Sequence, residues 1–204
     1  MSEKVMSTDS RIHSMGGFSK RQALGTKGLT VAGMLGALSI VLGMTPLGFI
    51  PLPTGINATT MHIPTIMAAI LGGPITGTLV GLIFGVNSFL RATTPFFANP
   101  IVAILPRLFI GVVSYYSYVG MKVVLTEKMK MSSAKGKSLA IVGASVLGTA
   151  TNTIGVLGLI YAFGYLPLAA VMTVAATNGI AEMIASAVIV LAVLKSLAKS
   201  RLFQ

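Results

Sequence analysis

The sequence predicts an all-α membrane protein, a bundle of six transmembrane helices with both termini in the cytoplasm. Hydrophobic residues make up 54% of the 204 residues and charged residues only 9%, which is too few to wet the surface of a soluble domain. Apolar runs longer than ordinary core helices recur along the chain, as they do in membrane spans. Most cations cluster in polar segments between these runs, and the positive-inside rule places such segments in the cytoplasm.

The Lys and Arg residues divide the chain. Of the 15 cations, five lie in residues 1–27, five in residues 122–137 and three in residues 195–201. We expect 1–27 to be a flexible cytosolic tail and 28–204 to be one membrane domain. Arg91 and Arg107 are the two cations outside these segments.

An even number of spans must join two cytoplasmic segments. The apolar runs predict four helices before Lys122 and two after Lys137, at 29–45, 61–72, 74–91, 99–121, 138–163 and 177–198. The second is short, since about 20 residues are needed to cross the hydrocarbon. The outward loops are then 46–60, stiffened by prolines, 92–98, and 164–176, which leaves room for a short interfacial helix.

Arg107 and Glu182 lie well inside predicted spans, where a charged residue costs about 2.5–3.5 kcal/mol on insertion scales and commonly marks a binding site. Asn99 and Pro100 are a good helix start, which puts Arg107 about 12 Å from the outer end. Pro106 should kink this helix and free a carbonyl group. Glu182 lies about 6 Å deep if the last helix starts near Asn178. Arg107 and Glu182 are therefore predicted either to contact a ligand or to form an ion pair with each other.

Other polar groups converge on the same outer half. Arg91 ends the third helix, where snorkelling to the interface would also explain it, and Asn87 lies one turn deeper. The remaining candidates for substrate binding are Asn99, Asn152, Thr153, Asn178, Phe96 and His62. Because the inner half has no such polar lining, we expect an outward-facing receptor embedded in the membrane rather than a channel.

Several function classes are excluded or disfavoured. The chain has no cysteine, no Asp inside a predicted span and no phosphate-binding loop, so we expect neither an enzyme nor a bound cofactor. A lone His62 without carboxylate or thiol neighbours predicts no metal site. The net charge of +11 fits topology and anionic lipid headgroups better than nucleic acid, because no aromatic residues are interleaved with the cations.

Two stretches carry a family resemblance. "HIPTIMAAILGGPITGTLVGLIFGVNSFL" and "FFANPIVAILPRLFIGVVSYY" resemble the substrate-binding S components of energy-coupling factor (ECF) vitamin transporters, over about residues 29–198. The resemblance implies six helices, a site near the outer surface, and a multi-pass protein of the bacterial cell membrane. It also implies partners: a transmembrane T component and two cytosolic ATPases, which would use the ATP.

In this family the first helix docks on the T component through small residues. Pairs with this spacing here are Ala32 with Gly36 and Gly33 with Ala37, with glycine in place of one alanine of each pair. Packing within the chain's own bundle would equally explain them.

The ligand is expected to be a small anion. The two positive charges of Arg91 and Arg107 and the negative charge of Glu182 sum to one net positive charge in the outer half. Pantothenate has a carboxylate, hydroxyls and an amide, and the sequence also resembles the pantothenate and hydroxymethylpyrimidine branches of the family. We therefore predict pantothenate, with hydroxymethylpyrimidine as the alternative if Glu182 neutralises Arg107. A stand-alone small-solute permease and a scaffold without ligand are the competing classes.

Overall fold

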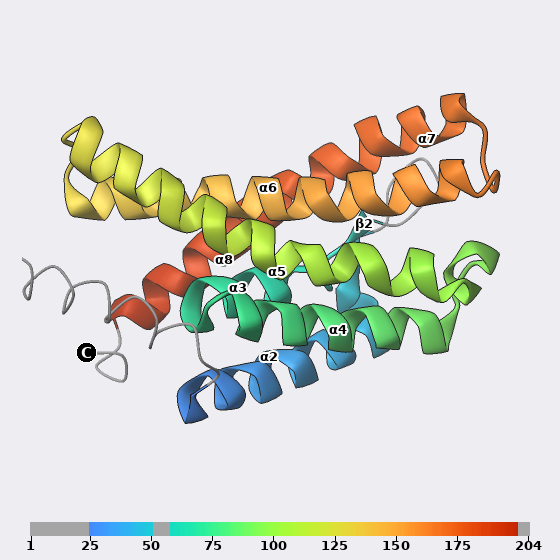
Figure 1. Cartoon of the computed structure of the whole chain (residues 1–204), viewed down its shortest axis with the longest axis horizontal. Helices are drawn as coiled ribbons and strands as arrows, with labels where there is room; N and C mark the ends of the chain where they lie inside the picture. Colours follow the sequence, from blue (N-terminus) through green and yellow to red (C-terminus); the bar gives the residue numbers. More distant parts are fainter. Residues whose placement is uncertain (1–24, 51–57, 200–204) are drawn as a thin grey trace, which may run out of the picture.

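The computed structural model describes residues 25–50 and 58–199 and is almost entirely helical (Figure 1). Its helices are α2 (Thr26–Met44), α3 (Ile63–Gly72), α4 (Pro74–Arg91), α5 (Pro100–Val123), α6 (Ser133–Ala162), α7 (Leu168–Val174) and α8 (Ile180–Lys199). A π-helical turn, η3 (Val124–Lys128), extends α5, and another, η4 (Ala175–Gly179), joins α7 to α8. Short 3-10 turns η1 (Pro46–Gly48) and η2 (Pro95–Ala98) begin two of the connections. The predicted tail lies outside the described residues except for its last three positions.

Four of the continuous helices are long and apolar enough to cross a membrane. They cover Thr26–Met44, Pro100–Lys128, Ser133–Ala162 and Leu168–Lys199. The structure therefore confirms an all-α protein with membrane-spanning helices. The first five predicted helices begin and end within a few residues of their predicted limits, apart from the extensions of α5 and α6 at the lysine-rich end.

The sequence predicts an outward loop at residues 164–176, with room for a short interfacial helix. Helix α7 starts at Leu168, directly after Pro167, and continues through η4 into α8 without interruption. A helix is therefore present in this segment, but it is an extension of the last apolar helix and not a separate interfacial one, so the predicted start of that helix at 177 is wrong. Glu182 therefore lies fourteen residues after Leu168, about 21 Å along the helix at the α-helical rise, and not one turn from its start.

The second apolar segment forms only a short helix. Helix α3 has ten residues, and the chain before it forms a two-stranded antiparallel ribbon in which β1 (Phe49–Ile50) pairs with β2 (Ala58–Thr59). Residues 60–62 follow β2 and are buried, as is Ala58. Non-helical backbone is tolerated at membrane depth where protein surrounds it, and this segment is buried by the rest of the bundle.

Helix α3 occupies the centre of the bundle. It contacts α2, α4, α5, α6 and α8, and every residue from Ile63 to Ala69 is buried (Figure 1). It ends at Gly73, whose φ of +93° is a conformation that favours glycine, and Pro74 then starts α4. The "LGGP" stretch thus reverses the chain within two residues.

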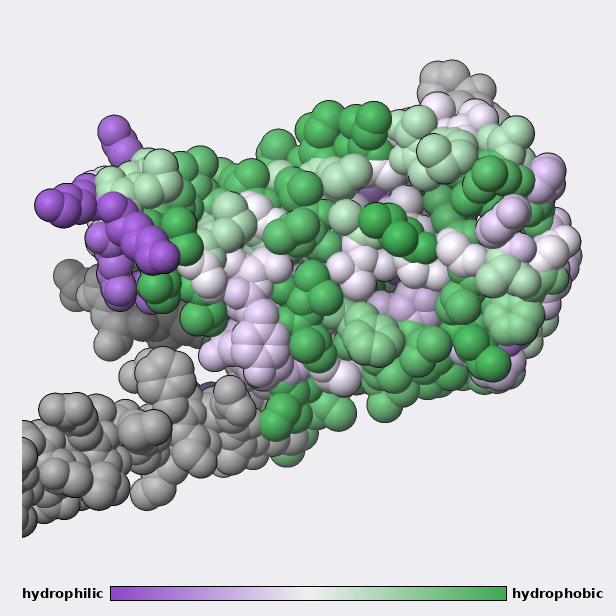
Figure 2. Space-filling view, turned by 45° about the horizontal axis from the view of Figure 1, so that its top comes forward, coloured by the Kyte–Doolittle hydropathy of each residue, from purple (hydrophilic) through white to green (hydrophobic). Residues whose placement is uncertain are grey.

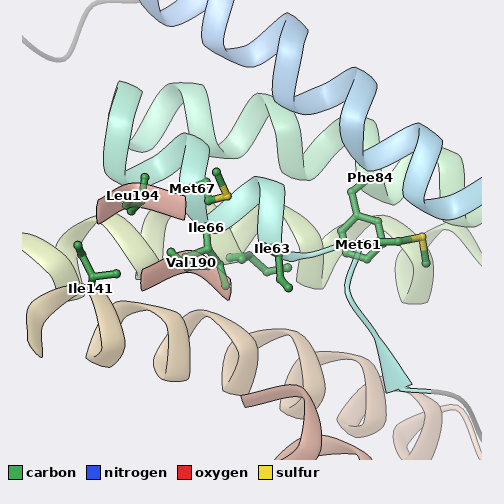
Figure 3. Packing of buried hydrophobic residues seen from close by; sticks show 9 residues of the cluster. Met61, Ile63, Ile66, Met67, Phe84, Ile141, Val190 and Leu194 are labelled. Carbon is green, nitrogen blue, oxygen red and sulfur yellow. The ribbon is translucent and has the colours of Figure 1, made fainter. Parts of the chain in front are cut away.

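The main core cluster lies around α3 (Figure 3). Ile66 and Met67 of α3 pack with Phe84 of α4, Ile110 of α5 and Val190 of α8. A second cluster of buried residues, which includes Val102, Val156 and Ile160, lies where α5 and α6 meet α7. Each cluster joins helices that are distant from one another in the sequence.

Helices α4 and α5 pack through their backbones. Gly77, Gly81 and Gly85 recur at every fourth residue of α4, and a Cβ at Gly85 would lie 2.9 Å from the Cα of Ile104. A Cβ at Gly77 would meet Gly111 at the same distance. These glycines therefore serve close packing within the bundle, as small residues do in lipid.

The exterior matches a lipid environment. Figure 2 shows hydrophobic side chains over most of the visible face and hydrophilic ones gathered at one end. Exposed apolar side chains include Leu90, Ile154 and Val188. The start of α2, the α5–α6 connection and the end of α8 all lie at one end of the bundle (Figure 1), which brings the described lysine-rich segments together.

Candidate ligand-binding site

A cavity of about 520 Å³ lies at the other end from the lysines, between α4, α5, α6 and α8. The β1–β2 ribbon and the connection from α4 to α5 also contribute to its walls. Eight of the ten predicted substrate-binding residues line it: Asn87, Arg91, Phe96, Arg107, Asn152, Thr153, Asn178 and Glu182. The volume suits a small organic molecule.

Asn99 and His62 do not line this cavity. The side chain of Asn99 caps α5, where its Oδ1 accepts from the backbone N–H of Ile101 at 3.0 Å. His62 is completely buried, with Nε2 placed 3.0 Å from Thr149 Oγ1, which in turn lies 2.8 Å from Ser186 Oγ. These polar groups tie α3, α6 and α8 together, so we leave both residues out of the site.

The side chain of Arg107 makes the hydrogen bond that Pro106 cannot make within α5. Proline has no N–H to donate to the carbonyl four residues earlier, which is that of Val102. Arg107 Nη1 donates to this carbonyl oxygen at 2.6 Å. The carbonyl that the sequence predicts to be free is therefore paired by the neighbouring side chain.

Two aromatic rings enclose the guanidinium of Arg107. Its Cζ lies 5.2 Å from the ring centre of Phe84 and 4.9 Å from that of Phe97, within the range of cation–π attraction. The side chain is only 3% exposed, and among the described residues its Nε has no hydrogen-bond partner. Arg107 is thus held at the cavity wall by one hydrogen bond and two aromatic contacts.

Glu182 anchors the β1–β2 ribbon to α8. Its Oε1 accepts from the backbone N–H of Thr59 at 2.6 Å and from Thr59 Oγ1 at 3.1 Å. Its Oε2 accepts more weakly from Thr153 Oγ1, at 3.5 Å. The hydrogen bonds of Glu182 and Arg107 thus run to different partners, although both side chains face the same cavity.

Arg91 and Asn87 form the opposite side of the cavity. Arg91 is exposed, ends α4, and its Cζ lies 5.8 Å from the ring centre of Phe49. Asn87 is one helical turn earlier, and its Nδ2 is buried without a partner in the described part of the chain. Both side chains approach Gly43 of α2.

Some lining residues were not predicted from the sequence. Phe84, Thr94 and Thr59 all contribute to the wall. Phe97 neighbours the predicted Phe96, and the ring pair is edge-to-face. The position of Thr59 depends on the pairing of β2 with β1, which no local pattern reveals.

The two predicted docking pairs on α2 face different ways. Ala32 and Gly36 are buried against the chain's own helices, and a Cβ at Gly36 would lie 2.6 Å from Ile83 Cδ1. Gly33 and Ala37 are exposed, with open space around Gly33. Since a buried pair cannot meet another protein, only Gly33 and Ala37 are accessible.

An apolar helical bundle that encloses a cavity with both apolar and polar walls defines a class: a membrane-embedded binding protein for a small molecule. Comparison with protein families identifies the member of that class. Residues 27–194 match the model described as "ECF transporter, substrate-specific component", and the chain belongs to this family.

A comparison with individual proteins finds a relative. The chain is 28% identical over 179 residues to the pantothenic acid transporter PanT of Lactococcus lactis subsp. cremoris (strain MG1363). The match covers 73% of this chain and 82% of the relative. The protein is therefore similar over most of its length to a pantothenic acid transporter.

Proposed function

We propose that the protein is the pantothenate-binding S component of an ECF importer. The observation that carries the ligand assignment is the similarity to a pantothenic acid transporter, because it extends over most of both chains. The cavity supports it independently in size and in charge.

The charge of the cavity favours an anionic ligand. Arg91 and Arg107 are its two cations and Glu182 is its acid, so the described wall carries one net positive charge. Asn87, Asn152 and Asn178 add amides that can serve the hydroxyls and the amide of pantothenate. Apolar groups such as Val156 and Leu157 suit its methyl groups.

The topology belongs to the same proposal. We infer six membrane crossings in the bacterial cell membrane, with α3 and the buried segment before it counted as one, and with both termini in the cytoplasm. The lysine-rich end then faces the cytoplasm and the cavity faces outward, in accordance with the positive-inside rule. A ligand would enter from outside.

We propose that transport requires partners. As an S component the chain would associate with a transmembrane T component, and two ATPases would use the ATP, so that this chain needs no cofactor and catalyses no reaction. Gly33 and Ala37 are the proposed contact on α2, since small exposed residues allow close helix approach.

Equilibrium binding of labelled pantothenate to the purified chain tests the ligand. Submicromolar binding of pantothenate, with much weaker binding of hydroxymethylpyrimidine, is the expected result. Tight binding of hydroxymethylpyrimidine alone would replace the ligand but keep the S-component role. Uptake of pantothenate by vesicles that contain only this chain, without ATP, would instead show a stand-alone permease.

A further inference from the structure

The two arginines of the cavity are in different situations. Arg107 is buried, donates to the Val102 carbonyl and is covered on its faces by Phe84 and Phe97. The hydrogen bond and the two rings hold the Arg107 side chain against its own helix, where it replaces the backbone bond that Pro106 cannot make.

Arg91 is placed to meet an incoming anion. It is exposed at the end of α4 and lines the cavity from its mouth, where its charge can attract a ligand from the aqueous phase. Its described contact is the stacking on Phe49, which holds the guanidinium over the ribbon but uses none of its N–H donors.

Asn87 supplies a second donor at the same place. Its Nδ2 is buried and unpartnered among the residues that the structure describes, which is costly unless an acceptor arrives. Asn87 Nδ2 and Arg91 Nη1 are the polar atoms nearest to the point where a Cβ on Gly43 would lie, with Nη1 3.4 Å from it. The two nitrogens are therefore neighbours.

Gly43 makes this arrangement possible. A methyl group there would collide with the Asn87 amide, so the absence of a side chain on α2 leaves room for both donors. An oxygen anion between them could accept one neutral and one charge-assisted hydrogen bond.

We propose that Arg91 and Asn87, which both line the cavity from α4, receive the carboxylate of the ligand, and that Arg107 is a structural residue. This inference rests on the proposed function, since it takes the ligand to be an anionic vitamin. It gives Arg107 neither of the two roles predicted from the sequence, a ligand contact or an ion pair with Glu182.

The test compares two ligands in each variant: pantothenate and its neutral analogue with a carboxamide in place of the carboxylate. Arg91→Gln should weaken pantothenate binding about tenfold or more, because a charge-assisted hydrogen bond is lost, and should leave the affinity for the analogue within about twofold. Asn87→Leu should act in the same direction. Arg107→Met, if it folds, should weaken both ligands equally.

Lys122→Gln is the matched control, because it removes the same charge from the last turn of α5, far from the cavity. It should change neither affinity. Equal losses for both ligands in Arg91→Gln, or no loss of pantothenate, would overturn the inference. So would a carboxylate-selective loss in Arg107→Met.

Binding by the wild-type protein distinguishes a failure of the proposed function from a failure of the carboxylate assignment. If the wild-type protein binds neither compound, the proposed function fails and the carboxylate assignment falls with it. If the wild-type protein binds both compounds with equal affinity, it binds the vitamin without recognising the carboxylate. In that case only the assignment of the carboxylate to Arg91 and Asn87 fails.

Discussion

Pro106 removes one backbone hydrogen bond from α5, and the side chain of the adjacent Arg107 replaces it. A carbonyl without a partner in an apolar bundle costs several kcal/mol, and so does an arginine without one. The hydrogen bond from Arg107 to Val102 and the two aromatic faces compensate for both costs together. The proline and the buried cation therefore depend on each other, and Arg107 also contributes to the cavity wall.

A double-mutant cycle measures this coupling. Arg107→Met should lower the thermal unfolding midpoint in the wild-type background. Pro106→Ala returns an N–H to the helix, so that Arg107→Met should cost about 1 kcal/mol less in that background. The midpoints of the four proteins in detergent give the coupling, and equal losses in both backgrounds would show that the Val102 bond contributes nothing.

Glu182 is a second residue whose role is set by contacts. Glu182→Ala should speed hydrogen exchange at the backbone N–H of Thr59, because this N–H loses its acceptor. Glu182→Gln keeps an acceptor oxygen and should exchange more slowly than Glu182→Ala. Mass spectrometry of peptides that contain Thr59 measures the difference.

Thr151→Val is the control for Glu182, since Thr151 Oγ1 is exposed and bonds only within α6. Its exchange at Thr59 should equal that of the wild type. Wild-type exchange in Glu182→Ala would show that the carboxylate does not hold the ribbon.

Helix α2 shows how one element can have two small-residue faces with different uses. Gly36 and Gly43 face inward, where Ile83 and Asn87 occupy the space above them. Gly33 and Ala37 face outward from the bundle. The i,i+4 spacing is the same in both cases, so the spacing alone does not assign a role.

Bulky substitutions separate the two faces. Ala37→Leu should leave ligand affinity unchanged but prevent co-purification with the T component and ATPases, if they dock as proposed. Gly36→Leu should instead lower the yield of folded protein, because its side chain would collide with Ile83. Retained co-purification of Ala37→Leu would move the docking surface elsewhere.

At the scale of the whole molecule, the lysine-rich segments and the cavity lie at opposite ends of the bundle (Figures 1 and 2). Anionic lipid and the positive-inside rule would hold the first end in the cytoplasm. This separation makes the orientation in the membrane a single, testable property of the fold.

The chain lacks cysteine, so single cysteines can report the orientation. Ala98→Cys at the cavity end should react with a membrane-impermeant thiol reagent on intact cells. Ser133→Cys at the lysine-rich end should react only after permeabilisation. The opposite pattern would show that the cavity faces the cytoplasm.

Much of the architecture was predictable from local patterns. Helix positions follow from apolar runs and from start signals such as Asn99-Pro100 and "LGGP", because these depend on nearby residues. The loop predicted at 164–176 failed since its apolar, proline-free part has no signal that would separate a helical extension from an interfacial loop. Eight of the ten predicted ligand residues line the cavity, because intramembrane polar residues are rare.

The sequence by itself determined the class of protein, the number of long apolar segments and the set of polar residues that the bilayer would not tolerate without partners. Only the tertiary structure decided what each of them does. Arg107 pairs with Val102, Glu182 with Thr59, and Arg91 remains at the mouth beside Asn87. The reason is that the cost of burying a polar group depends on the residue type, whereas its partner depends on which helices pack together.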